Sequence, residues 1–241
     1  MECCWIGLGG NLGDVPHTFA TVAAELHRHP EVRDVRSSPL YRSAPMGIHA
    51  GDEFWNAVVG CATSLTPHTL LDLLQQLETR HGRVRGLRWG PRPLDLDLIA
   101  FGGQRLRSPR LQVPHPGRIY RRFVLDPLCD LSPDWIDPEH QITAAALRRR
   151  LVQTPRQLAL CGEWDPQSVA AIEKQVERRW PDIVCGRDLP AANHGLVITP
   201  DESAGVGLPA VVVPREITGE GVVQFVLDAA TAAFEPPVRM L

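Results

Sequence analysis

Two aspartates in an alternating apolar segment are the residues best suited to chemistry in this chain. Asp95 and Asp97 alternate with Leu94, Leu96 and Leu98. In a β-strand the side chains at i and i+2 share a face, so both carboxylates point one way while the leucines point into a core. Neighbouring carboxylates repel unless a cation lies between them, and proteins usually hold Mg²⁺ with one or two carboxylates together with substrate phosphates.

The segment before the aspartates, residues 83–93, is a loop interrupted by glycine and proline. It carries four arginines, whose guanidinium groups can form bidentate hydrogen bonds with phosphate. Two strand aspartates alone are more simply explained as charges that protect a sheet edge from pairing with other chains. The arginine-rich loop favours a metal–phosphate site instead.

Composition indicates a soluble globular protein. The 241 residues allow one large domain or two small ones, and 44% hydrophobic with 22% charged residues is ordinary for a chain that buries a core. No apolar run approaches the ~20 residues of a membrane span, and the N-terminus lacks a secretory pattern. Six cysteines without a C-x-x-C pair predict reduced core thiols rather than zinc ligands. We therefore expect a cytoplasmic protein with no membrane partner.

Positive charge is concentrated in one stretch of the chain. Between Arg80 and Arg122 there are eleven arginines and only two acidic residues, a net charge of +9, although the whole chain carries −3. Such a region attracts a polyanion, either nucleic acid or a nucleoside triphosphate.

The glycine-rich turn at residues 9–14 follows an apolar strand over 3–8. It fails the G-x-G-x-x-G pattern and lacks a G-K-[ST] sequence, so it predicts neither a dinucleotide site nor a P-loop. We interpret it as a tight turn beside a ligand pocket. Asp14 is expected to cap the following helix, with Pro16 in its first turn and an end before Pro30.

The remaining N-terminal elements predict an antiparallel sheet with helices on one face, an α+β arrangement of ferredoxin-like kind. Strands are expected over 33–42, 54–65 and 121–125, and helices over 66–82, capped by Thr66, and 142–151. In the helix, Gln75 and Glu78 share a face that is expected to be solvated. Phe54 and Asn56 share a strand face, which fits either a flat heterocycle or an ordinary core.

At this point several motifs together resemble hydroxymethyldihydropterin pyrophosphokinases, enzymes of folate synthesis. The matching segments keep the family's order over roughly the first 150 residues, and the most specific is R-W-G-P-R-P-L-D-L-D at 88–97. The others are Gly9–Asp14, Tyr41–Ser43, Phe54–Val58, Gln75–Glu78, Gly82–Arg85, Val113–Pro116 and Arg121–Leu125.

The resemblance implies that ATP gives its β,γ-pyrophosphoryl group to the hydroxymethyl oxygen of a dihydropterin, releasing AMP. It implies that Asp95 and Asp97 hold two Mg²⁺ ions and that Arg83 and Arg92 hold the transferring phosphates. ATP would be surrounded by Gln75, Glu78, Arg85, Trp89, Arg110, His115 and Arg121. The pterin would be held by Ser43, Ala44, Met46, Phe54, Asn56 and Phe123, with both aromatic rings stacking on it.

The resemblance ends near residue 155, which divides the chain into residues 1–154, the pterin pyrophosphokinase domain, and residues 155–241. The second part carries a net charge of −5. Strands expected over 157–162, 183–186, 196–199 and 210–213, with helices over 166–180 and 219–234, predict a small α/β domain with a partly parallel sheet. We weigh two roles for it, a structural or oligomerising appendage and a regulatory or ligand-binding domain. The oligomeric state does not follow from the sequence.

A second function class stays open at this stage, since ferredoxin-like sheets with basic patches also bind RNA. The predicted strands lack a run of stacking aromatics, and Asp95 and Asp97 would repel a phosphate backbone unless a metal intervened. We therefore expect ATP and the hydroxymethyldihydropterin as partners, and no nucleic acid.

Overall fold

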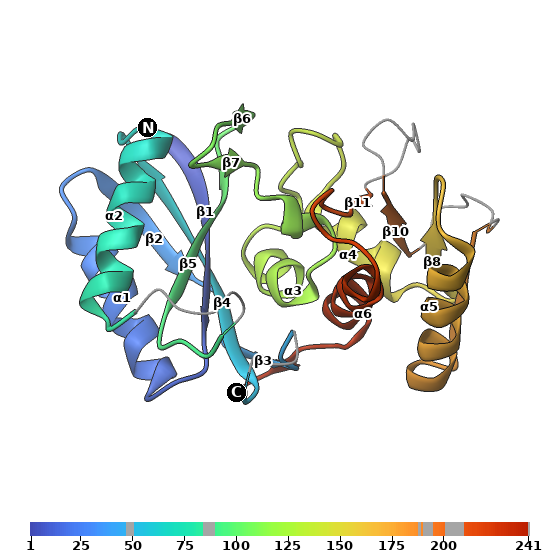
Figure 1. Ribbon diagram of the computed structural model, residues 1–241. Helices are drawn as coiled ribbons and strands as arrows, with labels where there is room; N and C mark the ends of the chain where they lie inside the picture. Colours follow the sequence, from blue (N-terminus) through green and yellow to red (C-terminus); the bar gives the residue numbers. More distant parts are fainter. Residues whose placement is uncertain (47–50, 84–89, 188, 190–194, 201–209, 241) are drawn as a thin grey trace.

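The computed structural model describes residues 1–46, 51–83, 90–187, 189, 195–200 and 210–240. Two sheets organise this part of the chain, one antiparallel and one parallel, with helices between and around them (Figure 1). The predicted α+β class, with a parallel sheet in the C-terminal part, is confirmed. The antiparallel sheet contains β1 (Glu2–Gly10), β2 (Val32–Ser37), β3 (Tyr41–Ser43), β4 (Phe54–Thr63), β5 (Asp95–Phe101) and β12 (Val238–Arg239).

Strands β4 and β1 form the centre of the antiparallel sheet, whose order is β12-β3-β4-β1-β5, with β2 also pairing with β4. The two strands pair along their whole length, from Glu2 opposite Thr63 to Gly10 opposite Trp55. Gly60 faces the Trp5 ring so closely that an added Cβ would lie 2.4 Å from a ring carbon. The centre of the sheet therefore depends on a glycine that makes room for an aromatic ring.

Helices α1 (Val15–Arg28) and α2 (Pro67–Arg80) cover one face of this sheet (Figure 1). The predicted caps are confirmed: Asp14 accepts a hydrogen bond from the His17 amide at 3.1 Å, and Thr66 accepts one from the Thr69 amide at 3.2 Å. Each cap satisfies an amide that the first helical turn leaves without a partner. The shared core contains inward side chains of both helices and of β1, β4 and β5.

The opposite face of the sheet is covered by α3 (Arg122–Leu131), so the expectation of helices on one face is wrong. The prediction of a strand over 121–125 is also wrong, because most of this segment belongs to α3. Val124 and Leu128 pack against Trp5 and Val58 of the sheet, and this i, i+4 spacing is helical. A short apolar run does not distinguish a strand from a buried helix, and here the sheet face that needed covering favours the helix.

The C-terminal part contains α4 (Ala144–Val152), β8 (Arg156–Leu160), α5 (Pro166–Arg179), β9 (Ile183–Gly186), β10 (Leu196–Thr199), β11 (Val211–Val212) and α6 (Glu220–Phe234). Its sheet has the order β11-β10-β8-β9, and all the pairs are parallel. Helix α6 lies between α3 of the first part and α5 of the second (Figure 1). One hydrophobic cluster joins both parts, because it includes Met46, Tyr120 and Leu125 together with residues of α6 and the parallel sheet.

Smaller elements complete the fold. A hairpin of β6 (Leu106–Arg107) and β7 (Gln112–Val113) precedes a 3₁₀ helix, η1 (Pro116–Ile119). The six cysteines are free thiols, and all except the exposed Cys3 are at least partly buried, so the expectation of core thiols fails for that residue. Among the described residues, no helix has the length and apolar character needed to cross a membrane.

Candidate active site

The two aspartates lie at the start of β5, the strand at one end of the antiparallel sheet. Asp95 is opposite Gly9 of β1, and Asp97 is opposite Gly7. The leucines that alternate with them, Leu94, Leu96 and Leu98, are buried in the core, as the alternation predicts. Because β5 is an edge strand, protection of the edge fits its position in the sheet as well. What distinguishes the two carboxylates is that both line a cavity.

This cavity, of about 70 Å³, joins residues from four segments of the chain. It brings together all six side chains that the sequence assigned to the pterin, both aspartates, and two arginines. The lining residues are Ser43, Ala44, Met46, Phe54, Asn56, Arg92, Asp95, Asp97, Arg121 and Phe123.

Asn56 lines the cavity and is buried, with only 5% of its surface exposed. Its side-chain amide donates to the Ser43 hydroxyl at 2.9 Å and to the Phe54 carbonyl at 3.1 Å. These bonds follow from the pairing of β3 with β4, which places Ser43 opposite Phe54 and Tyr41 opposite Asn56. The carboxamide is therefore held in one orientation, as recognition of the edge of a flat heterocycle requires.

The two aromatic residues of the cavity come from different elements, Phe54 from β4 and Phe123 from the first turn of α3. The Arg92 guanidinium carbon lies 5.6 Å from the centre of the Phe54 ring, and that of Arg121 lies 5.7 Å from the centre of the Phe123 ring. Although residues 121–125 do not form a strand, Arg121 and Phe123 still reach the same cavity. Arg121 is the cap residue with extended backbone, so helical periodicity does not fix its direction.

Arg83 and Arg92 contact Asp95 from two sides. Arg83 Nη1 lies 2.5 Å from Asp95 Oδ1, and Arg92 Nη1 lies 3.1 Å from Asp95 Oδ2. Arg83 also forms an ion pair with Glu78. The structure thus brings together three of the residues to which the sequence assigned phosphate or metal contacts.

Glu78 corrects the expectation of a solvated helix face, because it is buried between α2 and β5. Its carboxylate accepts a hydrogen bond from the Leu96 amide at 2.7 Å. Burial raises the pKa of Glu78, although the Leu96 amide and Arg83 oppose the shift. Periodicity placed Glu78 correctly on its helix, but the proximity of β5 was not visible in the local sequence.

The two aspartates differ in their electrostatic surroundings. Burial raises the pKa of Asp95, and the neighbouring charge of Asp97 raises it further, against the effect of Arg92 and Arg83. The side chain of Asp97 is 42% exposed, and its Oδ2 lies 3.9 Å from His115 Nε2. Burial, with the charges of Arg121 and Arg118, lowers the pKa of His115 to about 3, so its imidazole is neutral near pH 7. The site therefore carries crowded negative charge on one edge and arginines around it.

The residues assigned to ATP divide into three groups. Gln75, Glu78 and Arg83 line an open groove along α2, and Arg110 lies beside it, donating to Asp72 at 2.6 Å. His115 and Arg121 lie near Asp97. Arg85 and Trp89 lie outside the described residues.

Two further residues hold the site and were not singled out from the sequence. Asn11 accepts a hydrogen bond from the Arg92 amide at 2.9 Å, and its own amide donates to the Arg92 carbonyl at 2.9 Å. Gly10 permits this approach, since an added Cβ would lie 2.6 Å from the Pro93 carbonyl oxygen. The glycine-rich turn thus holds the arginine loop, and its composition was the available signal.

Arg118 is the second, with 1% of its surface exposed. It donates to the His115 carbonyl at 3.1 Å and is bound by Asp137 and Glu139. Other arginines of the positively charged stretch between residues 80 and 122 are also paired with carboxylates. Ion pairs of this kind are formed by Arg80, Arg107, Arg110 and Arg122. Among the described residues of this region, these ion pairs offset part of the positive charge.

Comparison with known families gives one match that covers more than half of the chain. The model of 7,8-dihydro-6-hydroxymethylpterin-pyrophosphokinase (HPPK) matches residues 5–133. This range contains the cavity, the aspartates and the arginine loop.

Two proteins with a pyrophosphokinase name are similar to this chain in sequence. The Pseudomonas aeruginosa protein named 2-amino-4-hydroxy-6-hydroxymethyldihydropteridine pyrophosphokinase is 48% identical over 134 residues, which are 56% of this chain and 83% of that protein. The Synechocystis protein of the same name is 39% identical over 171 residues, 69% of this chain and 87% of that protein. A crystal structure of Plasmodium falciparum HPPK-DHPS superposes with a TM-score of 0.47 and 12% identity, covering 95% of this chain and 59% of that chain.

Proposed function

The chain belongs to the 7,8-dihydro-6-hydroxymethylpterin-pyrophosphokinase family, and we propose from this premise which of its residues bind each substrate and which carry the transfer. The reaction moves pyrophosphate from ATP, the co-substrate, to the hydroxymethyl group of 6-hydroxymethyl-7,8-dihydropterin and releases AMP, a step of folate biosynthesis. The observation that carries the proposal is the cavity that joins six predicted pterin residues to Asp95, Asp97 and Arg92.

The pterin occupies this cavity with its ring between Phe54 and Phe123. Asn56, whose orientation is fixed by Ser43 and the Phe54 carbonyl, bonds the heterocycle's polar edge. Ser43, Ala44 and Met46 form the adjoining wall. The hydroxymethyl group then lies toward the two aspartates, since these line the same cavity.

ATP lies along the groove of α2 and reaches the aspartates with its phosphates. Gln75, Glu78 and Arg83 line the groove. Arg83 also contacts Asp95, as does Arg92. Arg85, Trp89, Arg110, His115 and Arg121 complete the nucleotide contacts in this proposal. Phosphoryl-type transfer depends mainly on positioning and on neutralising charge, and arginines supply both.

The donor set fits Mg²⁺. Asp95 and Asp97 share a cavity, and the raised pKa of Asp95 reflects burial and the unrelieved charge of its neighbour. Within the described ranges, no group of three or more His, Cys, Asp or Glu side chains is arranged to hold a metal. Two carboxylates with substrate phosphates and water are the usual environment of protein-bound Mg²⁺. When bound, two such ions would neutralise phosphate charge and polarise the acceptor oxygen.

The test of these assignments compares Asp97→Asn with Asp134→Asn, an exposed aspartate outside the cavity. With ATP, Mg²⁺ and the pterin, Asp134→Asn should form AMP at the parent rate. Loss of a metal-holding carboxylate costs several kcal/mol of transition-state stabilisation, so Asp97→Asn should be slower by about 10³-fold. Binding of Mn²⁺ in the presence of a non-hydrolysable ATP analogue, followed by electron paramagnetic resonance, should weaken in parallel.

A near-normal rate or undiminished Mn²⁺ binding in Asp97→Asn would place the metals elsewhere. The proposal also includes a cytoplasmic location and the absence of nucleic-acid and membrane partners. The pairing of most described arginines with carboxylates supports the nucleic-acid part of it.

A further inference from the structure

The last strand of the chain pairs with the strand that leads into the pterin cavity. β12 is antiparallel to β3, with Val238 opposite Arg42 and Arg239 opposite Tyr41. The Met240 amide extends this pairing by donating to the Leu40 carbonyl at 2.8 Å. Without β12, the three-residue strand β3 would be held in the sheet by β4 alone, and short edge strands are weakly fixed.

A side-chain contact reinforces the same edge. Asp130 at the end of α3 accepts a hydrogen bond from the Tyr41 hydroxyl at 2.7 Å, and Arg239 Nε lies 3.7 Å from the same Asp130 oxygen. One carboxylate therefore links α3, β3 and β12. This arrangement fixes β3 immediately before Ser43, the residue that orients Asn56.

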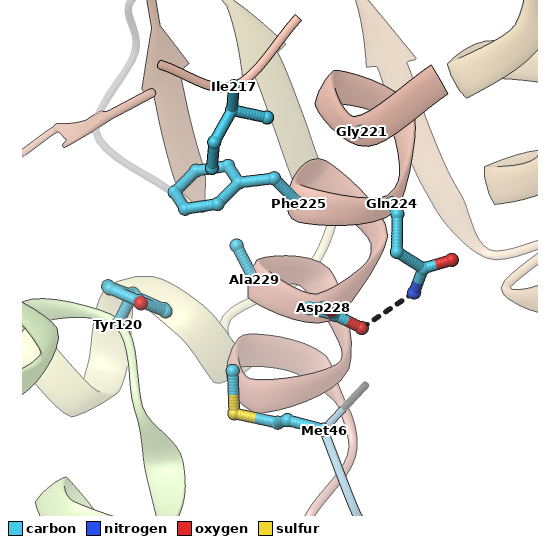
Figure 2. A pocket seen from close by; sticks show the side chains of 8 residues that line it. All are labelled: Met46, Tyr120, Ile217, Gly221, Gln224, Phe225, Asp228 and Ala229. Atoms are coloured by element: carbon cyan, nitrogen blue, oxygen red, sulfur yellow. Dashed lines mark hydrogen bonds between the residues drawn. The ribbon is translucent and has the colours of Figure 1, made fainter. Parts of the chain in front are cut away.

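The helix that delivers β12 also supports the cavity wall from behind. Met46 lines the pterin cavity and, on its other side, a second cavity of about 260 Å³ bounded by α6. Figure 2 shows Met46 beside the lower turns of α6, below Ala229 and near Tyr120, with Phe225 above them. Met46 is 8% exposed and belongs to the same hydrophobic cluster as Ala229 and Phe234. The wall of the pterin cavity is thus packed against the C-terminal part of the chain.

We propose that β12, held by α6, is a positioning element of the pterin site that fixes β3 and the wall formed by Ser43, Ala44 and Met46. This inference rests on the proposed pterin site and gives the C-terminal segment a role in substrate binding that neither an oligomerising nor a regulatory appendage requires. The ATP groove lies on α2, which contacts β5, and β5 is at the opposite end of the strand order from β12. The effect should therefore be specific to the pterin.

Met240 offers a matched pair of variants. Met240→Pro removes the amide that bonds Leu40, whereas Met240→Ala keeps it, and proline is compatible with the extended backbone of the residue before it. Because it removes one hydrogen bond, Met240→Pro should raise the KM for the pterin about two- to twelvefold. The KM for ATP should stay at the Met240→Ala value. A variant lacking residues 237–241 should raise the pterin KM at least as much.

Asn56→Ala separates this inference from the proposed site. If Asn56→Ala leaves the pterin KM unchanged, the assignment of the cavity fails. If Asn56→Ala raises it while Met240→Pro and the five-residue deletion do not, β12 has no positioning role and only this inference fails. Equal changes in the KM values for pterin and ATP would also overturn it, since they would indicate a general loss of structure.

Discussion

Two arginine–aspartate clusters in this protein use the same residue types to opposite ends. In the first, buried Arg118 binds both carboxylate oxygens of Asp137, and Asp137 also accepts hydrogen bonds from the Glu139 and His140 amides at 2.9 and 2.8 Å. In the second, Asp95 contacts two arginines, Arg83 and Arg92, and accepts no backbone amide from the residues that the structure describes. The side chain of Asp97 is 42% exposed.

The electrostatics follow the geometry. Burial favours a raised pKa for Asp137, but the hydrogen bonds and charge of Arg118 prevail and lower it below 3.8. For Asp95, burial and the charge of Asp97 prevail over the arginines, and the pKa is raised. A carboxylate whose hydrogen bonds are all made, such as Asp137, serves the fold. A crowded and partly bonded pair, such as Asp95 and Asp97, is suited to binding a cation together with phosphates.

Breaking the first cluster should have the largest effect on stability. Asp137→Ala leaves the Arg118 guanidinium buried without its bidentate partner, which should lower the free energy of unfolding by about 3–5 kcal/mol. Urea denaturation followed by circular dichroism measures this change. Asp134→Ala, at an exposed position nearby, is the control and should stay within about 0.5 kcal/mol of the parent. A small loss for Asp137→Ala would mean that the ion pair is not a stabilising contact.

Breaking the second cluster should impair catalysis instead. Arg92→Ala removes a guanidinium that faces both Asp95 and the Phe54 ring. Loss of one donor to transferring charge typically lowers kcat by about 10²–10³-fold, with little change in the urea midpoint. Steady-state AMP formation gives the first quantity and denaturation the second. If Arg92→Ala unfolded the protein while retaining its rate, the contrast between the clusters would be reversed.

The contribution of the first cluster to stability should depend on pH. The folded-state pKa of Asp137 is lowered, so its contribution to stability is present above the unfolded-state pKa of about 3.9 and is lost as pH falls through the folded-state value. The stability gap between the parent and Asp137→Asn should therefore be constant above about pH 5 and narrow below about pH 4. Urea midpoints measured from pH 2.5 to 7 test this. A gap that persists unchanged at the lowest pH would show that Asp137 titrates normally.

The smallest effect should come from Asn11, which holds the backbone of Arg92 rather than its charge. Asn11→Ala removes the acceptor for the Arg92 amide, a bond that contributes about 0.5–1.5 kcal/mol, so kcat/KM should fall about tenfold or less. Asn11 acts by positioning Arg92. The double variant Asn11→Ala/Arg92→Ala should therefore lower kcat/KM little more than Arg92→Ala alone. Additive losses would show that Asn11 acts independently of Arg92.

Local patterns predicted much of this structure because their causes are local. The alternation of leucine and aspartate places both carboxylates on one face of a strand, and Asp14 and Thr66 cap their helices through amides three residues ahead. The motif resemblance assigned six residues to one ligand, and the structure places all six around one cavity. Periodicity, capping and motif order need no information about distant segments.

Long-range packing decided the rest. Residues 122–131 form a helix because one face of the sheet required cover, and Glu78 is buried because β5 passes beside α2. The pairing of β12 with β3 joins residues about two hundred positions apart, and a two-residue strand carries no periodic signal of its own. The sequence alone determined which side chains are available for chemistry, whereas only the tertiary structure decided which charges are satisfied, because burial and ion pairing depend on neighbours that are distant along the chain.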